Sequence, residues 1–240
     1  MIDYPLALVT GAANRLGRSF ALALARLGYA ILLHYHHSAD AANITADEIR
    51  TLGVPVYIVK ADLTDSAQIQ SLFSTLDPLN LKLKILVNSA AEMRRADIRT
   101  ISVDDWDATL NLNLRASLLL AQRSAAHMLE GGLIVNITDA GAGKAWTGFP
   151  AYQVSKAGLE VLTRLLAKTY APAIRVNAIA PGLVLPSSDI TPEDWMKLVS
   201  RLPLKHPASN EDITAALEFL IRNESITGQT IVVDGGYSLL

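Results

Sequence analysis

Cysteine is absent from the 240-residue chain, and charged residues make up only 18% of it. Without cysteine the protein has no disulfide bonds, no thiolate chemistry and no zinc site with sulfur ligands, and we expect no bound metal. The 21 Lys and Arg residues nearly balance the 23 Asp and Glu residues. No overall positive charge therefore attracts nucleic acid or an acidic membrane surface.

Long hydrophobic runs are also missing. No stretch approaches about 18 uninterrupted apolar residues, which argues against a membrane-spanning helix. The segment from Met1 to Pro5 lacks the basic and apolar parts of a secretory signal, so we expect a cytoplasmic protein. Half of the residues are hydrophobic. Together with the low charged fraction, this predicts additional buried surface, in a sheet covered on both faces or between subunits.

Apolar segments of strand length alternate with segments of helical periodicity. We expect strands at residues 6–10, 30–35, 56–60, 85–88, 133–138, 175–180 and 230–233, and helices near 15–28, 40–52, 66–76, 104–129, 150–170, 192–201 and 210–222. Several strands are apolar at nearly every position, as in parallel strands covered on both faces. The alternation predicts a doubly wound parallel α/β sheet in a single domain spanning residues 1–240. Ligands bind such sheets beyond the carboxyl ends of the strands.

The first strand-to-helix turn contains Gly11 and Gly17. Such a turn presents backbone N–H groups and the positive end of a helix to a pyrophosphate. Alternatively, the glycines only allow helix and strand to approach closely. Arg15 stands where a dinucleotide-binding fingerprint has its third glycine. A long cation at this position indicates a ligand with an additional negative group.

The second predicted strand ends without the acidic residue that an NAD site uses to bind ribose hydroxyls, because the first carboxylate after it is Asp40. Arg15, His36, His37 and Ser38 together could donate to a 2′-phosphate, which favours NADPH over NADH. The alternatives are that the histidines gather in this loop by chance and that Ser38 only caps the next helix.

Tyr152 and Lys156 are spaced i, i+4 at the start of a predicted helix, so their side chains share a face. An ammonium close to a phenol favours the phenolate and makes the tyrosine a better acid near neutral pH. The alternative is an ordinary amphipathic helix with a lysine extended along its surface.

Several further motifs occur in a fixed order. They are Thr10-Gly11, Asp62 in Ala61-Asp62-Leu63-Thr64, Asn88-Ser89-Ala90, Asn113 in Asn111-Leu112-Asn113, Tyr152-x-x-x-Lys156, Arg175-Val176-Asn177 running into Pro181-Gly182, Thr227-Gly228-Gln229 and Val233-Asp234-Gly235-Gly236. In this order and spacing the sequence resembles the short-chain dehydrogenase/reductase family over essentially its whole length.

The resemblance implies a Rossmann-like, seven-stranded domain that transfers a hydride from a nicotinamide dinucleotide. It implies that Tyr152 protonates the reduced substrate, that Lys156 holds the nicotinamide ribose and lowers the pKa of Tyr152, and that Asn113 positions a water. The other implied cofactor contacts are Gly11, Leu16, Gly17, Asp62, Leu63, Asn88, Ala90, Pro181 and Gly182.

Asp139 stands where most members of the family have a serine that donates to a substrate carbonyl. An ionised carboxylate cannot donate a hydrogen bond and repels a developing oxyanion. Asp139 therefore suits a substrate with N–H groups or a ring nitrogen that must be protonated. The alternative is that Thr138 takes the role of the serine, although alternation along the strand directs its side chain to the opposite face.

Three departures, namely Arg15, the segment 34–38 and Asp139, resemble the pteridine reductase branch of the family, which includes the dihydromonapterin reductases. The resemblance implies NADPH-dependent reduction of a C=N bond in a dihydropterin, with Met93, Asp139, Tyr152 and Leu183 as substrate contacts. The branch usually has an aromatic residue in place of Met93 and a hydroxyl donor near Ala91. Trp146, Phe149 and Trp195 are candidates for the missing ring or for ordinary packing.

Two other functions remain open. One is a short-chain reductase of a carbonyl substrate, such as a ketone, a quinone or a 3-oxoacyl thioester. The other is a non-catalytic dinucleotide sensor or scaffold on the same fold. The apolar circumference of the helices near 104–129 and 150–170 predicts a homo-oligomer, and the resemblance implies a homotetramer. It also implies that residues 183–200 form a substrate lid.

Overall fold

The computed structural model describes residues 4–76, 81–187 and 190–240, and strands and helices alternate along it. The strands are β1 (Leu6–Val9), β2 (Ala30–Tyr35), β3 (Val56–Lys60), β4 (Leu83–Asn88), β5 (Met128–Ile137), β6 (Ile174–Pro181) and β7 (Thr230–Val233). The α-helices are α1 (Arg15–Arg26), α2 (Ala39–Thr51), α3 (Ser66–Ser74), α4 (Val103–Leu110), α5 (Ala116–His127), α6 (Pro150–Tyr170), α7 (Pro192–Arg201) and α8 (Asn210–Arg222). A π-helical segment (Asn111–Arg115) joins α4 to α5, and a 3₁₀ turn (Tyr237–Leu239) follows β7.

The strands form one parallel sheet in the order β3-β2-β1-β4-β5-β6-β7. From β1 the chain adds β2 and β3 on one side and then crosses to add β4 to β7 on the other. This reversal between β1 and β4 creates a crevice at the carboxyl ends of the strands, where doubly wound sheets bind ligands. The sheet confirms the predicted fold class.

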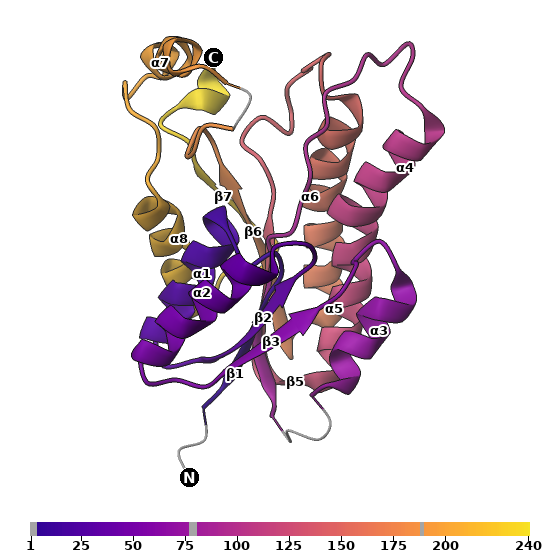
Figure 1. Ribbon diagram of the computed structural model, residues 1–240, viewed down its shortest axis with the longest axis vertical. Coiled ribbons are helices and arrows are strands. Elements are labelled where there is room, and N and C mark those ends of the chain that lie inside the picture. Colours follow the sequence, from indigo (N-terminus) through magenta and orange to yellow (C-terminus); the bar gives the residue numbers. More distant parts are fainter. Residues whose placement is uncertain (1–3, 77–80, 188–189) are drawn as a thin grey trace.

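Helices cover both faces of the sheet, α1, α2 and α8 on one face and α3, α5 and α6 on the other (Figure 1). Successive strand residues enter opposite cores, as β1 illustrates. Ala7 and Val9 pack with Phe20 of α1, whereas Leu6 and Leu8 belong to the core that contains α3 and α5. Because side chains alternate along a strand, a sheet buried on both faces has apolar residues at nearly every position.

The predicted helix over 104–129 differs from the structure in two ways. Helical backbone runs from Val103 to His127 but widens into the π-helical segment, which periodicity does not reveal. The next strand begins at Met128, five residues before the predicted start at 133, because Met128 pairs with Leu83 of β4. The sequence Glu130-Gly131-Gly132 hid this extension, since glycine usually weakens a strand.

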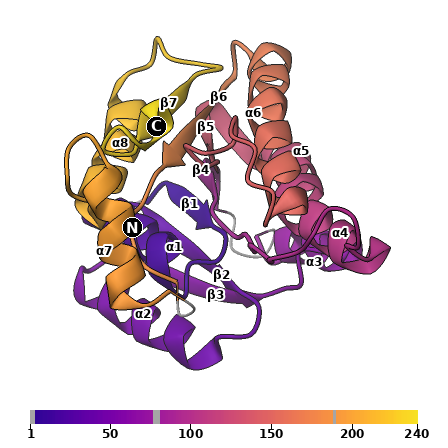
Figure 2. The same cartoon turned by 90° about the horizontal axis from the view of Figure 1, so that it is seen from above.

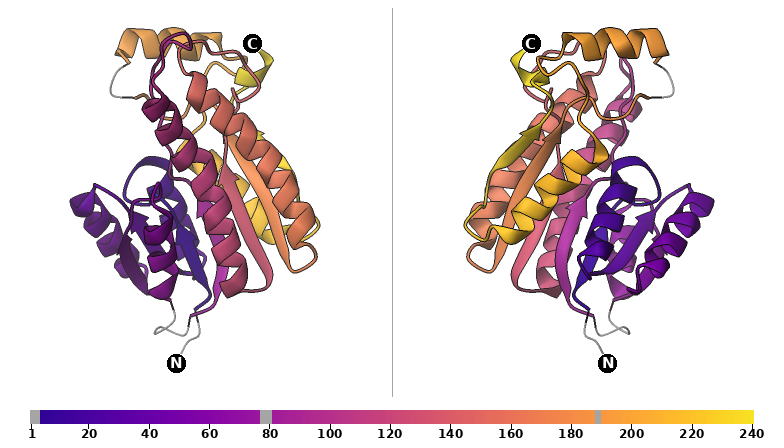
Figure 3. Two further views of the ribbon diagram at one scale, coloured as in Figure 1. Left: turned by 90° about the vertical axis from the view of Figure 1, so that its right-hand side faces the viewer. Right: turned by 90° about the vertical axis from the view of Figure 1, so that its left-hand side faces the viewer.

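Helix α7 has no buried residue and lies above the carboxyl ends of the strands (Figures 2 and 3). It belongs to the segment 183–200 that was predicted to be a lid, of which residues 188 and 189 lie outside the described part of the chain. None of the helices in the described ranges is both long enough and apolar enough to span a bilayer.

Candidate active site

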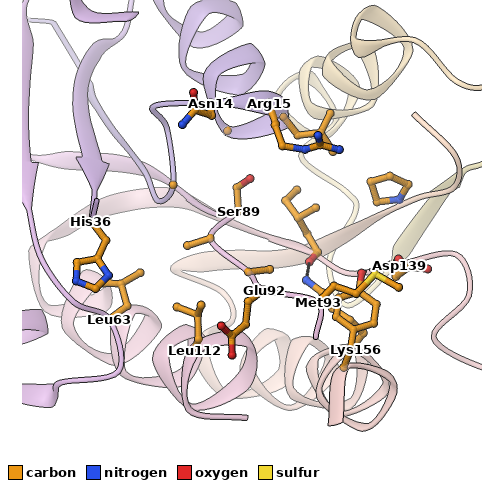
Figure 4. Close-up of a pocket in the computed structure, with 18 of the residues that line it drawn as sticks. Asn14, Arg15, His36, Leu63, Ser89, Glu92, Met93, Leu112, Asp139 and Lys156 are labelled. Carbon is orange, nitrogen blue, oxygen red and sulfur yellow. Dashed lines mark hydrogen bonds between the residues drawn. The ribbon is translucent and has the colours of Figure 1, made fainter. Parts of the chain in front are cut away.

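A cavity of about 740 Å³ opens at the carboxyl ends of the strands, where the order of strands reverses (Figure 4). Segments that follow β1, β2, β3, β4, β5 and β6 all contribute side chains to it. The residues predicted from sequence that line it are Gly11, Arg15, Leu16, Gly17, His36, His37, Asp62, Leu63, Ala90, Met93, Asp139, Tyr152, Lys156, Pro181 and Gly182. The fold thus brings residues from the whole length of the chain to one site.

The glycines of the first turn permit two close approaches. Gly11 has a φ of +64°, and a Cβ atom on it would lie 3.1 Å from the Cα of Ala90. A Cβ atom on Gly17 would lie 2.2 Å from the carbonyl oxygen of Gly11, well inside contact distance. Both glycines are therefore needed for packing. The alternative interpretation, that they allow helix and strand to approach closely, is partly correct. The tight packing also brings the start of α1 to the edge of the cavity.

His34, which the sequence analysis named only as part of the segment 34–38, fixes the position of this turn. The Gly11 N–H donates to Nδ1 of His34 (3.1 Å), and the other ring nitrogen lies 3.0 Å from the carbonyl oxygen of Ala61. Burial lowers the pKa of His34 to about 4, so the ring is neutral at physiological pH. Because Nδ1 accepts, Nε2 carries the proton and donates to Ala61. The backbone N–H of Ala12 donates to the carbonyl oxygen of the same histidine.

The N–H groups available to an anion therefore lie in the first turn of α1. The first bond of the helix runs from the Arg18 N–H to the Asn14 carbonyl, so the N–H groups of Leu16 and Gly17 have no carbonyl partner within the helix. The Asn14 side chain makes no capping bond. This end of α1 is therefore suited to a phosphate group.

The four residues predicted to bind a 2′-phosphate do not form a single cluster. His36 and His37 stack with ring centroids 3.6 Å apart, and His36 Nε2 lies 4.0 Å from a carboxylate oxygen of Asp62. Ser38 precedes α2 without a side-chain capping bond and does not line the cavity. Arg15 extends away from His36, toward the side of Asp139 (Figure 4).

The guanidinium of Arg15 donates to the carbonyl oxygens of Leu185 (3.0 Å) and Pro186 (3.2 Å). These carbonyls belong to the segment after β6, so Arg15 lies apart from the histidines in this arrangement, and its contact with a 2′-phosphate stays a prediction. The sequence spacing between Gly11 and Arg15 predicted that Arg15 lies on the turn. It did not predict the direction of the long Arg15 side chain. Val184 and Leu185 line the cavity, whereas the predicted contact Leu183 does not.

Thr10 holds the segment after β4 against the first turn, because its hydroxyl accepts the N–H groups of Ser89 (2.9 Å) and Ala90 (3.0 Å). Asn88, predicted to line the cofactor channel, is 4% exposed, and its amide donates to Asn136 within the sheet (2.8 Å). Asn88 is outside the cavity lining, and its contact with a cofactor stays a prediction. As the last residue of β4, it stabilises the strand pair.

Asn113 lies in the π-helical segment and is almost completely buried. Its amide group binds the backbone of Glu92 twice, accepting from the N–H and donating to the carbonyl oxygen (both 2.9 Å), and also donates to the hydroxyl of Ser155 (3.1 Å). Asn113 therefore links the segment after β4 to α6. π-Helical turns often occur at functional sites.

Asp139 and Tyr152 form the central polar pair. The Tyr152 hydroxyl donates to Oδ2 of Asp139 (2.6 Å), and Oδ1 accepts the Gly141 N–H (2.6 Å). Burial raises the pKa of Asp139, and burial together with the neighbouring carboxylate raises the pKa of Tyr152 well above its usual value. At neutral pH the phenol keeps its proton and shares it with Asp139.

Lys156 is buried behind this pair. Its ammonium donates to the carbonyl oxygen of Ile137 (2.7 Å) and lies 5.7 Å from the centre of the Tyr152 ring. Burial lowers the pKa of Lys156 to about 8, against the attraction of Asp139. Burial and the Asp139 carboxylate raise the pKa of Tyr152, which opposes the lowering expected from Lys156, and that expectation stays a prediction.

Thr138 lines the cavity, but its hydroxyl donates to the carbonyl oxygen of Ile179 (3.3 Å). The carboxylate of Asp139, in contrast, faces Tyr152. The geometry therefore favours Asp139 over Thr138 as the partner of Tyr152.

Comparison with known proteins agrees with this geometry. The family model described as "Enoyl-(Acyl carrier protein) reductase" matches residues 11–238. The (2S)-[(R)-hydroxy(phenyl)methyl]succinyl-CoA dehydrogenase subunit BbsD of Thauera aromatica is 37% identical, over 99% of this chain and 98% of that protein. The 3-oxoacyl-[acyl-carrier-protein] reductase FabG of Staphylococcus aureus is 31% identical, over 96% of each.

Among solved structures, FolM alternative dihydrofolate reductase 1 from Brucella canis, complexed with NADP, superimposes with a TM-score of 0.93 at 33% identity. The alignment covers 100% of this chain and 96% of that one. The shared sheet and the motifs from the first turn to the segment after β7 show that this chain is an oxidoreductase of the short-chain dehydrogenase/reductase family.

Proposed function

We propose that the protein is an NADPH-dependent reductase of the C=N bond of a dihydropterin. The observation that carries the proposal is the hydrogen bond from Tyr152 to Asp139, which puts a carboxylate where a carbonyl reductase needs a neutral donor. A buried carboxylate accepts N–H groups, and a pterin presents an amino group and ring N–H groups along one edge.

The cavity suits NADPH. The first turn of α1 offers the N–H groups of Leu16 and Gly17 to the pyrophosphate, and His36 and His37 lie at the end of β2, where a 2′-phosphate belongs. Lys156 has N–H groups beyond its bond to Ile137 and would hold the nicotinamide ribose. NADP in the related FolM structure supports this choice of cofactor. When bound, NADPH supplies the hydride to the ring carbon of the substrate.

The residues of the chain supply the proton. Tyr152 is protonated at neutral pH, and it delivers that proton to the ring nitrogen as the carbon is reduced. Asp139, whose pKa is also raised, then returns a proton to Tyr152 from solvent. The Lys156 ammonium stabilises the negative charge left on this pair. General acid catalysis of this kind contributes about 10²–10⁴-fold to the rate.

A second candidate function is reduction of a carbonyl in a thioester substrate. It is favoured by the names of the curated relatives, which act on a succinyl-CoA derivative and on 3-oxoacyl-[acyl-carrier-protein]. Met93 also leaves this alternative open, because a methionine packs on an aromatic ring less specifically than a second ring does.

The test is oxidation of NADPH, followed at 340 nm (the usual assay wavelength), with dihydrobiopterin, dihydromonapterin and dihydrofolate. We expect turnover of at least one pterin, and loss of it in Asp139→Ser. Failure of the wild-type protein to reduce any pterin would refute the proposal. If Asp139→Ser instead gains activity on acetoacetyl-CoA, carbonyl reduction is a property of this site that the carboxylate suppresses.

The proposal includes a homotetramer and a lid within a single domain spanning residues 1–240. Exposed Val154, Val161 and Leu165 form an apolar stripe on the outer face of α6, with side chains 48%, 49% and 61% exposed. A second copy of α6 would cover this stripe. The segment after β6 leads into α7, which has no buried residue, and its attachment to Arg15 suits a lid that closes over the substrate.

A further inference from the structure

Two segments lie side by side beyond the carboxyl ends of the strands, one that follows β4 and one that joins β5 to α6 (Figure 1). They are linked by a hydrogen bond from the Ala96 N–H to the Gly148 carbonyl oxygen (3.0 Å). Met93 and Arg94 line the cavity, and Arg95 follows them directly with an exposed side chain. Arg95 is therefore an exposed residue directly next to the cavity lining.

The charges of this segment are unevenly compensated. Arg94 bonds to Glu92 and Asp105, and Arg99 bonds to Asp97. Arg95 has no carboxylate partner within residues 4–76, 81–187 and 190–240. Its one interaction there is with the ring of Phe149, whose centre lies 5.6 Å from Cζ of the arginine.

The Arg95 guanidinium has no hydrogen-bond partner among the described residues, so its N–H groups are available to a ligand. The fork of N–H groups on a guanidinium matches a carboxylate or a phosphate. Phe149 is itself held by Trp146, with ring centroids 6.5 Å apart. The two rings meet edge to face and form an apolar surface beside the charge.

We propose that Arg95 and Phe149 form a subsite for the anionic end of an elongated substrate whose reacting group lies between Met93 and Asp139. The inference rests on the proposed reductase function but not on the identity of the reacting group. The anion is either the carboxylate of a folate-type tail or the phosphate of a coenzyme A thioester. Either anion would bind the Arg95 guanidinium, with the chain that carries it passing beside the Phe149 ring.

The experiment compares kcat and KM of the wild-type protein and Arg95→Gln on two matched pairs of substrates. Dihydrofolate has a carboxylate tail and dihydrobiopterin has none, while acetoacetyl-CoA has phosphates and ethyl acetoacetate has none. We expect KM for the substrate with the anionic tail to rise about five- to tenfold in the variant, with kcat nearly unchanged. The tail-free partner should be unaffected. The pair of substrates whose KM ratio changes shows whether Arg95 binds a carboxylate or a phosphate.

Arg99→Gln is the matched control, because Arg99 lies in the same segment and is already paired with Asp97. Arg95→Lys should recover part of the affinity. Added salt should weaken the binding of substrates with an anionic tail more in the wild-type protein than in Arg95→Gln. Equal changes on both members of a pair, or no change in the ratio of their KM values, would overturn the inference. Absence of all pterin turnover would refute the proposed function alone, since the carbonyl pair would still test Arg95.

Discussion

The buried ammonium of Lys156 makes the stability of the protein depend on pH. Burial lowers the pKa of Lys156 from 10.5 to about 8. Each pKa unit corresponds to ~1.36 kcal/mol, so the folded state disfavours the charged lysine by about 3 kcal/mol relative to the unfolded chain. The buried Lys156 ammonium close to Tyr152 therefore lowers the free energy of unfolding.

The direction of the effect follows from proton binding. Between about pH 8 and pH 10.5 the unfolded chain keeps the proton on Lys156 while the folded protein has lost it. The unfolded state then binds more protons, so raising the pH favours folding. Below pH 8 both states are charged and the full cost is present. Above pH 10.5 both are neutral and the cost is gone.

Lys156→Met removes the titrating group and keeps much of the side-chain volume. We expect the free energy of unfolding of the wild-type protein, minus that of the variant, to rise by about 3 kcal/mol between pH 7 and pH 10.5, as measured by urea denaturation. Loss of the hydrogen bond to Ile137 shifts this difference by a constant amount and leaves its pH dependence unchanged. All other titrating groups are common to both proteins.

Lys168→Met is the control, because Lys168 is exposed on the same helix and should show no such rise. A wild-type-minus-Lys156→Met difference that stays constant or falls over this pH range would refute the reasoning. The variant should also lose activity at every pH, since it cannot hold the nicotinamide ribose or stabilise charge on Tyr152 and Asp139.

Three further predictions follow from the site and the surface. Tyr152→Phe should lower kcat by about 10²–10⁴-fold with unchanged NADPH affinity, measured by fluorescence titration, and a loss of less than tenfold would exclude Tyr152 as the proton donor. Gly17→Ala should lower the free energy of unfolding by about 1–3 kcal/mol or more in urea denaturation. Gly143→Ala is the control and should not, because Gly143 has open space around it. Equal stability of the two variants would contradict the packing of the first turn. Val161→Glu combined with Leu165→Glu should convert the proposed tetramer to smaller species in light scattering, and a wild-type monomer at micromolar concentration would refute the tetramer.

The fold was largely predictable because its signals are local. Nearly continuous apolar segments predicted the buried parallel strands, and the helices at 150–170, 192–201 and 210–222 begin and end where expected. The errors occurred where a distant partner decides the structure. Met128 extends β5 because Leu83 is available to pair with it, and the π-helical segment aligns Asn113 with the backbone of Glu92.

The residues of the site were also mostly predictable, because family motifs name the side chains that surround the cavity. Their interactions were less so. Arg15 bonds to the carbonyls of Leu185 and Pro186 instead of joining the histidines, and Asn88 turns into the sheet. His34 gave a weak signal, as one of three histidines in a short segment, and its role depends on burial next to Gly11 and Ala61.

The sequence by itself determined the order of the elements and the coverage of the sheet on both faces, because both follow from hydrophobic periodicity. It also determined the presence of Tyr152, Lys156 and Asp139, which the spacing of the motifs identifies. Only the tertiary structure decided how these groups ionise. Asp139 and Tyr152 are 13 residues apart, yet folding brings them into hydrogen-bond contact and removes them from water. Burial and proximity set their pKa values, and both arise when distant segments pack together.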